Sequence, residues 1–225
     1  MITDLPEMIA QILAIVFVLT THEFAHGYVA YKFGDETAKR MGRLTLNPLK
    51  HFDPIGLLAF VLTRFGWAKP VPINPNNFKN KRQGYLWTSA AGVLVNYCTA
   101  FLVYPIVLWI INCVEVSQWS MFLYAFFYYT YSCSLSFCVF NLLPLYPLDG
   151  FRIVEATDRK HRKVHLFLRK YSSIILIVLV VIHYLSQNFT FLTYVDLLGF
   201  AMQHIVKMLA SPIEWVGMRI IKAII

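Results

Sequence analysis

Two histidines and a glutamate lie close together near the start of the chain and could hold a metal ion. In His22-Glu23-Phe24-Ala25-His26 the imidazoles are four residues apart, so on a helix they lie one above the other on the same face. This spacing suits a single zinc ion. Glu23 beside the metal could take a proton from zinc-bound water and pass it to a leaving amine while zinc polarises a carbonyl. The residues therefore predict zinc-dependent hydrolysis.

A catalytic zinc ion needs a third protein ligand and an open position for water. Asp149 is the candidate for that ligand, within a segment in which Pro144 and Pro147 forbid continuous helix and Gly150 permits a tight turn. Irregular backbone of this kind is tolerated at membrane depth where it is buried in protein or lines a wet cavity.

The composition places these residues in a membrane protein. Of the 225 residues, 58% are hydrophobic and 14% are charged, far from the soluble balance of roughly half apolar and a quarter charged. Ionisable groups within an apolar helix each cost kilocalories to insert, so an intramembrane cluster of them indicates function. The alternative reading of the two histidines is a hydrogen-bonded pair between helices.

Long apolar segments predict the helices that position the cluster. Four spans are expected at about residues 8–31, 86–111, 119–143 and 171–185. Residues 55–63 are too short to span and predict a re-entrant or interfacial segment. Residues 192–209 fit either a weak fifth span or an amphipathic surface helix, and residues 213–225 fit an interfacial segment.

The positive charges follow the predicted loops and give an orientation. Residues 32–82 contain ten Lys and Arg, residues 152–170 contain seven, and residues 112–118 contain none. By the positive-inside rule the two basic stretches are cytoplasmic and the N-terminus is outside. The histidines and Asp149 then both lie near the inner ends of their helices and can meet at one depth. The same distribution by loop argues against nucleic-acid binding, despite a net charge of +8.

The loop after the first predicted helix has strand and turn signals at residues 42–48 and 71–75. A short strand with a free edge could hold an extended substrate by main-chain hydrogen bonds. A folded loop with no role in substrate binding fits the same residues.

Together, these motifs resemble the site-2 protease family of intramembrane metalloproteases. The resemblance is carried by His22 to His26, by Asn141-x-x-Pro-x-x-Pro-Leu-Asp-Gly150 and by Gly42-Arg-Leu-Thr-Leu-Asn-Pro48, and it covers about residues 12–154. The segments 46–56 and 66–74 resemble the compact bacterial and archaeal branch. The family implies that His22, His26 and Asp149 bind zinc and that Glu23 is the general base.

Two asparagines are candidates for binding substrate. The family's Gly-Pro motif with a following Asn appears here as Ala91-Gly-Val-Leu-Val-Asn96, in which Val93 replaces the proline. Asn96 could bond substrate or a developing oxyanion, or make an interhelical hydrogen bond instead. Asn141 is a similar candidate for bonding substrate or backbone.

The sequence as a whole predicts an all-α polytopic membrane protein. We expect one domain over residues 1–225, with a three-helix catalytic core at about 8–155, one to three peripheral helices at about 171–225 and a small cytoplasmic β element. The predicted function is intramembrane cleavage of single-span membrane proteins near the cytoplasmic face, with one Zn²⁺ per chain, in a prokaryotic cell membrane. A partner protein could regulate it. An inactive relative that binds membrane segments and a metal transporter are the alternatives.

Overall fold

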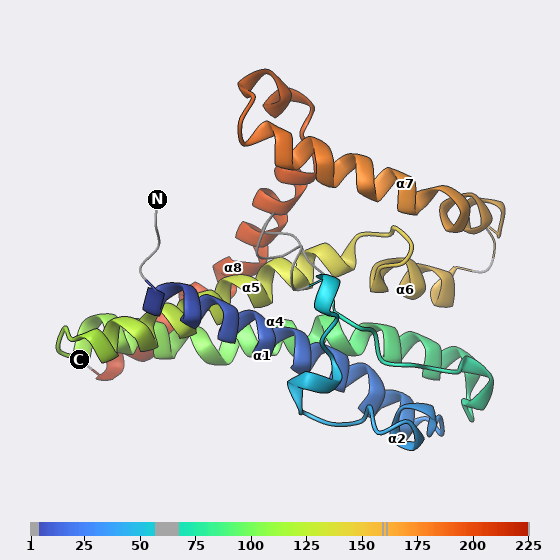
Figure 1. The fold of residues 1–225 in the computed structure, drawn as a ribbon, viewed down its shortest axis with the longest axis horizontal. Helices are drawn as coiled ribbons and strands as arrows, with labels where there is room; N and C mark the ends of the chain where they lie inside the picture. The colour runs from blue at the N-terminus through green and yellow to red at the C-terminus, as the bar shows by residue number, and fades with distance from the viewer. Residues whose placement is uncertain (1–4, 57–67, 159, 161, 225) are drawn as a thin grey trace.

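The computed structural model describes residues 5–56, 68–158, 160 and 162–224, which form helices joined by irregular loops (Figure 1). The long helices are α1 (Leu5–Lys32), α4 (Lys81–Cys113), α5 (Gln118–Leu142), α7 (Arg162–Ser186) and α8 (Leu197–Ile224). The short elements are α2 (Thr37–Arg40), α6 (Asp149–Thr157) and the 3₁₀ turns η1 (Pro48–Lys50), η2 (Pro75–Asn77) and η3 (Thr190–Val195). The predicted all-helical class is confirmed. The predicted segment 55–63 lies almost wholly outside the described residues.

Among the described residues, three stretches are long and apolar enough to cross a membrane: Leu5–Lys32, Lys81–Cys113 and Lys163–Ser186. They correspond to the first, second and fourth predicted spans. The third, α5, is a helix of 25 residues, about 37 Å long at 1.5 Å per residue. Its many tyrosines and serines lower its hydropathy, so its membrane crossing stays a prediction based on length and packing.

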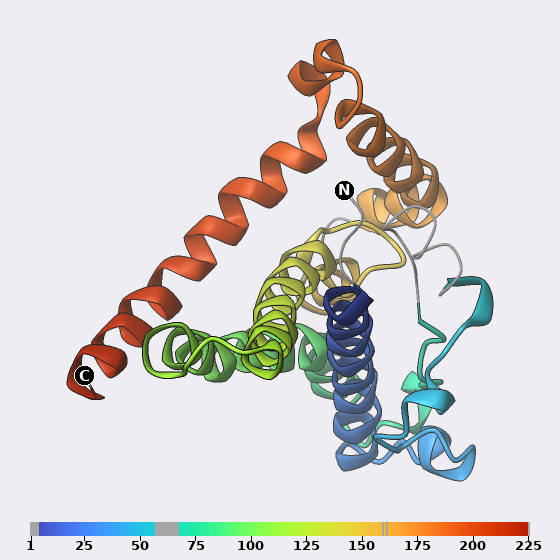
Figure 2. The same ribbon diagram turned by 60° about the vertical axis from the view of Figure 1, so that its left-hand side comes forward.

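Helices α1, α4 and α5 pack against one another and form the predicted three-helix core. The ends are set by local capping: the Asn80 side chain accepts a hydrogen bond from the Gln83 amide at the start of α4, and Ser117 and Ser120 form a capping box at the start of α5. Only a few residues separate α4 from α5, so the two helices run antiparallel, side by side (Figures 1 and 2).

The peripheral part consists of α7, η3 and α8. Helix α7 lies apart from α1 and α4, whereas α8 runs back along the bundle and packs on α4 and α5 (Figure 2). Buried side chains of three helices meet there: Ala100, Val103, Val107, Tyr131, Leu135, Ala210 and Ile213. The two segments predicted at 192–209 and 213–225 are therefore mostly one helix, which continues through Pro212.

Asp196 joins α7 to α8. Its Oδ1 accepts a hydrogen bond from the Gly199 amide at 2.7 Å, at the start of α8, and its Oδ2 contacts His183 Nδ1 of α7 at 2.8 Å. The Ser186 hydroxyl also donates to Oδ2, at 2.8 Å. The turn between the two peripheral helices is thus held by one carboxylate.

The predicted small β element is absent from the described residues, and this part of the prediction was wrong. Residues 42–47 and 71–74 are irregular loop, and the prolines that follow them, Pro48 and Pro75, begin the 3₁₀ turns η1 and η2. Prolines at 70, 72 and 75 have no amide hydrogen for a ladder, and the amides of Val71 and Asn74 donate to the side chains of Glu23 and Asp35 instead. Side-chain carboxylates thus accept the hydrogen bonds that the backbone of a neighbouring strand would accept in a sheet.

Candidate metal centre

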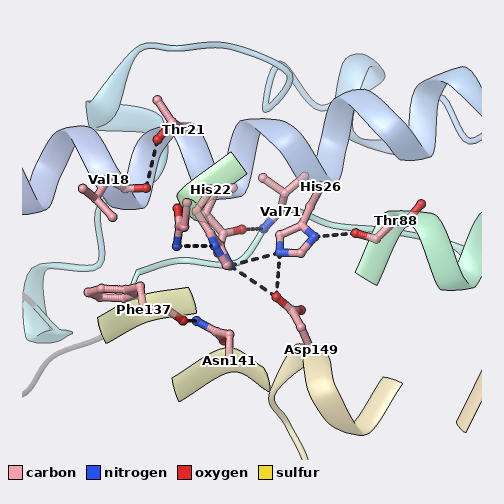
Figure 3. A network of polar contacts seen from close by, with 11 residues as sticks. Val18, Thr21, His22, His26, Val71, Thr88, Phe137, Asn141 and Asp149 are labelled. Carbon is pink, nitrogen blue, oxygen red and sulfur yellow. Dashed lines mark hydrogen bonds and ion pairs between the residues drawn. The ribbon is translucent and has the colours of Figure 1, made fainter. Parts of the chain in front are cut away.

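The two histidines of α1 point their Nε2 atoms to a common point. His22 and His26 are both buried, each with 5% of its surface exposed, and their Nε2 atoms are 3.0 Å apart. The helical spacing of four residues puts them on the face that α1 turns toward α4 and α5 (Figure 3).

Helix α4 supports both rings from behind. His26 Nδ1 lies 2.6 Å from the Thr88 carbonyl oxygen, and His22 Nδ1 lies 3.1 Å from Asn96 Nδ2. A metal-binding histidine usually bonds a partner through its second nitrogen, which orients the ring. Both rings therefore present Nε2 to the centre of the site.

Gly92 lies between those two supporting residues and allows α4 to come close. A Cβ added at Gly92 would overlap His22 Cε1 and His26 Nε2. The sequence analysis missed Thr88 and gave Gly92 no role, although Thr88, Gly92 and Asn96 share the i, i+4, i+8 spacing of one helix face. That periodicity was the available signal.

Asp149 reaches the same point from the start of α6. Its Oδ2 lies 3.4 Å from His22 Nε2 and 3.1 Å from His26 Nε2, and the residue is 5% exposed. The next residue, Gly150, is needed for close packing, because a Cβ there would overlap the carbonyl groups of Leu142 and Leu143 at the end of α5. Pro144 and Pro147 prevent α5 from continuing, and Gly150 allows α6 to begin close beside its end.

The three ligand atoms suit a zinc ion. In tetrahedral coordination with bonds of about 2.0–2.1 Å, neighbouring ligand atoms are roughly 3.3–3.4 Å apart. The separations here are 3.0, 3.1 and 3.4 Å. Two imidazoles and a carboxylate are also a common catalytic zinc set. Within the described residues, these three side chains form the cluster of His, Cys, Asp or Glu that could hold a metal ion.

Glu23 follows the first of these histidines and is partly exposed. Its Oε2 accepts a hydrogen bond of 2.7 Å from the Val71 amide. A carboxylate has about four acceptor sites, so this bond leaves capacity for a water or a substrate group. The sequence analysis did not identify Val71, and no spacing rule links it to Glu23.

The segment that carries Val71 is held on both sides. Arg43 Nη2 donates to the Lys69 carbonyl at 2.8 Å, and the Lys69 amide donates to the His51 carbonyl at 2.9 Å. On the other side, the Asn74 amide donates to Asp35 Oδ2 at 2.6 Å. The Val71 amide is thereby fixed against Glu23.

Asn141 lies near the end of α5, and Figure 3 shows it on the Asp149 side of the site. Its Nδ2 donates to the Phe137 carbonyl of the same helix at 3.1 Å. The structure thus gives this amide a local backbone partner, and its binding of substrate stays a prediction. Asn96, the other residue predicted to bind substrate, lies against the His22 ring.

Known proteins resemble this chain. YwhC of Bacillus subtilis, a candidate zinc metalloprotease, is 44% identical over 146 residues, which cover 64% of this chain and 67% of YwhC. Peptidase family M50 matches residues 110–185. The chain belongs to this family, the site-2 proteases. Its predicted class, a zinc metalloprotease, is thereby confirmed, and its apolar helices make it a multi-pass membrane protein.

More distant members of the family show how far the likeness extends. The candidate zinc metalloprotease Rip2 of Mycolicibacterium smegmatis is 30% identical over 142 residues, and Rip2 of Mycobacterium tuberculosis is 27% identical over 141. The chain spans 52% of the length of each. The stretch matched by the M50 family contains Asp149, but it begins well after the histidine pair and does not include it. No solved structure matches the chain.

Proposed function

We propose that this M50 protein is an intramembrane endopeptidase that binds one zinc ion through His22, His26 and Asp149. The observation that carries the proposal is the convergence of the three ligand atoms, separated by 3.0–3.4 Å, in a buried site. Burying a carboxylate among apolar helices is costly unless it is paired or binds a cation. A zinc ion would supply that compensation.

The chemistry proposed is hydrolysis of a peptide bond. When bound, zinc would activate a water molecule and polarise the scissile carbonyl. Glu23 would accept the proton of the attacking water and deliver it to the departing nitrogen. The Val71 amide would hold the Glu23 carboxylate in one orientation during both transfers.

The proposed substrates are segments of single-span membrane proteins, cut near the cytoplasmic face. In the part of the chain that the structure describes, three helices have the length and hydropathy of membrane spans. The two basic stretches favour a cytoplasmic position for the loops after α1 and α6 and an outside N-terminus. The metal centre lies toward the ends of α1 and α5 that adjoin these stretches, so it would open to the cytoplasm. The relatives are bacterial, which favours a bacterial cell membrane.

The proposal is tested by metal analysis of the purified chain in detergent. We expect about one zinc per chain, as a single site requires, and near-complete loss of zinc in His22→Ala and in Asp149→Ala. The matched control is Asp53→Ala, which removes a carboxylate whose acceptor bonds are to the nearby Ile55 and Gly56 amides. Zinc retained by the Asp149 variant would refute its assignment as the distant ligand.

A further inference from the structure

Asn96 is wholly buried, with 0% of its surface exposed, and its amide lies against the ring of His22. We infer that Asn96 is a positioning residue: its side-chain oxygen accepts a hydrogen bond from His22 Nδ1–H and so directs Nε2 to the metal. The inference rests on the proposed zinc site. It gives Asn96 a role through His22 in place of direct contact with substrate.

The proton on His22 needs an acceptor in this site. A neutral imidazole that binds a metal through Nε2 carries its proton on Nδ1, so Nδ1 needs an acceptor. For His26 that acceptor is the Thr88 carbonyl oxygen, 2.6 Å from Nδ1. For His22 the group at the same place is the Asn96 amide, 3.1 Å away. The two rings therefore have equivalent supports, one helical turn on either side of Gly92.

The Asn96 amide can present its oxygen to the His22 ring. The oxygen and nitrogen of an asparagine side chain exchange places by a half-turn that moves no other heavy atom. Asn96 Oδ1 is buried and has no hydrogen-bond partner within the described part of the chain. Nothing there holds the oxygen away from the ring, and the half-turn places it against Nδ1–H.

Asn96 is also closed off from any substrate by its burial. A side chain that binds a peptide must present a polar atom to the space that the peptide enters. Asn96 lies on the α4 face covered by α1, in line with Thr88 and Gly92, and is fully enclosed. The Asn96 amide can influence the reaction by holding the His22 ring, whose Nε2 would bind the metal.

The test compares two substitutions in the purified chain. Zn²⁺ affinity is measured in detergent by competition with a chelating dye. Asn96→Leu fills a similar volume without an acceptor, and we expect zinc affinity to fall about 10- to 100-fold. Asn96→Asp has only acceptor oxygens, so we expect affinity within a few-fold of wild type. The matched control on the same helix is Asn112→Ala, an exposed amide bonded to the Leu108 carbonyl of its own helix.

Three results would count against the inference or against the site beneath it. Wild-type zinc affinity in a folded Asn96→Leu chain, judged by its circular dichroism, would overturn the positioning role. An equal loss of zinc affinity in Asn96→Asp would overturn the acceptor role. If the leucine variant does not fold, the zinc affinity of Asn96→Asp decides whether the inference holds. A wild-type chain that binds no zinc would instead refute the proposed function. The visible spectrum of bound Co²⁺ gives a second readout, since a misdirected His22 changes the ligand geometry.

Discussion

Glu23 and the three candidate metal ligands have different partners, which suits them to different functions. His22, His26 and Asp149 face one another through ligand atoms, whereas Glu23 bonds the Val71 amide and stays partly exposed. A single substitution can therefore separate metal binding from proton transfer.

Glu23→Gln makes that separation. Glutamine has the same shape and keeps an oxygen that can accept the Val71 amide hydrogen, but it cannot take a proton from water. We expect zinc content to be unchanged and cleavage of a tagged single-span membrane protein to fall about 10²- to 10⁴-fold, the usual range for a lost general base. Cleavage is measured by immunoblot beside the wild-type chain. Cleavage at the wild-type rate would remove Glu23 from the mechanism.

Gly92→Ala tests how closely α4 must approach the histidines. The added methyl group would overlap both rings, and overpacking of this kind costs about 1–3 kcal/mol. We expect zinc affinity to fall roughly 10- to 100-fold, measured by dye competition. Cys98→Ala, at an exposed position of the same helix, is the control and should bind zinc normally. Full affinity in Gly92→Ala would mean that α4 has room to move.

At the scale of elements, the loop between α1 and α4 depends on Asp35. This buried carboxylate accepts hydrogen bonds from the hydroxyl and amide of Thr37, from the Asn74 amide and from Asn77 Nδ2. Burial raises the pKa of Asp35, but these hydrogen bonds outweigh it and hold the pKa below its usual value. The same bonds anchor the segment whose amide contacts Glu23.

The pH dependence of stability follows from that lowered pKa. A carboxyl group whose pKa is lower in the folded state stabilises the fold above its ordinary pKa, and this contribution is lost as the pH falls through the folded-state pKa. We expect Asp35→Asn to destabilise the chain at pH 7 by about 1.5–3 kcal/mol, the range for hydrogen bonds to a charged group.

Thermal unfolding followed by circular dichroism between pH 7 and pH 3 measures the effect. The difference between wild type and Asp35→Asn should shrink toward the acid end. Glu36→Gln, at the exposed neighbouring carboxylate, is the control and should behave like wild type. A difference that stays constant with pH would show that the carboxylate charge plays no part.

The whole molecule combines a three-helix core with an α7–α8 arm that returns to it. The core supplies His22 and His26, α6 supplies Asp149, and the arm contributes Ala210 and Ile213 to the buried cluster with α4 and α5. The proposed position of the metal centre near the cytoplasmic face depends on the direction in which these helices cross the membrane.

Cysteine labelling tests that direction. Cys113 ends α4 at an exposed position, so a chain with the other three cysteines replaced by alanine carries a single reporter in the 112–118 connection. With the N-terminus outside, a membrane-impermeant maleimide should label Cys113 in intact cells. A cysteine placed at exposed Lys50, in a cysteine-free chain, should be labelled only after the cells are opened. The reverse pattern would overturn the proposed orientation.

Local spacing was enough to predict much of this protein. The i, i+4 repeat of His22 and His26 is set by helix geometry, apolar length indicated the long helices, and Pro144, Pro147 and Gly150 marked the break that delivers Asp149. Each of these depends on interactions within a few residues of chain, which a sequence displays directly. Their meeting in one buried cluster was predicted from the orientation of two helices.

Only the tertiary structure decided which groups surround the cluster. The Val71 amide bonds Glu23 across 48 residues of chain, and Asn96 bonds His22 across 74. The loop expected as strands is irregular because carboxylates of α1 and its C-terminal turn satisfy its amides. Such pairings depend on which donor and acceptor the packed helices bring within about 3 Å, and the spacing of residues along the chain does not contain that distance.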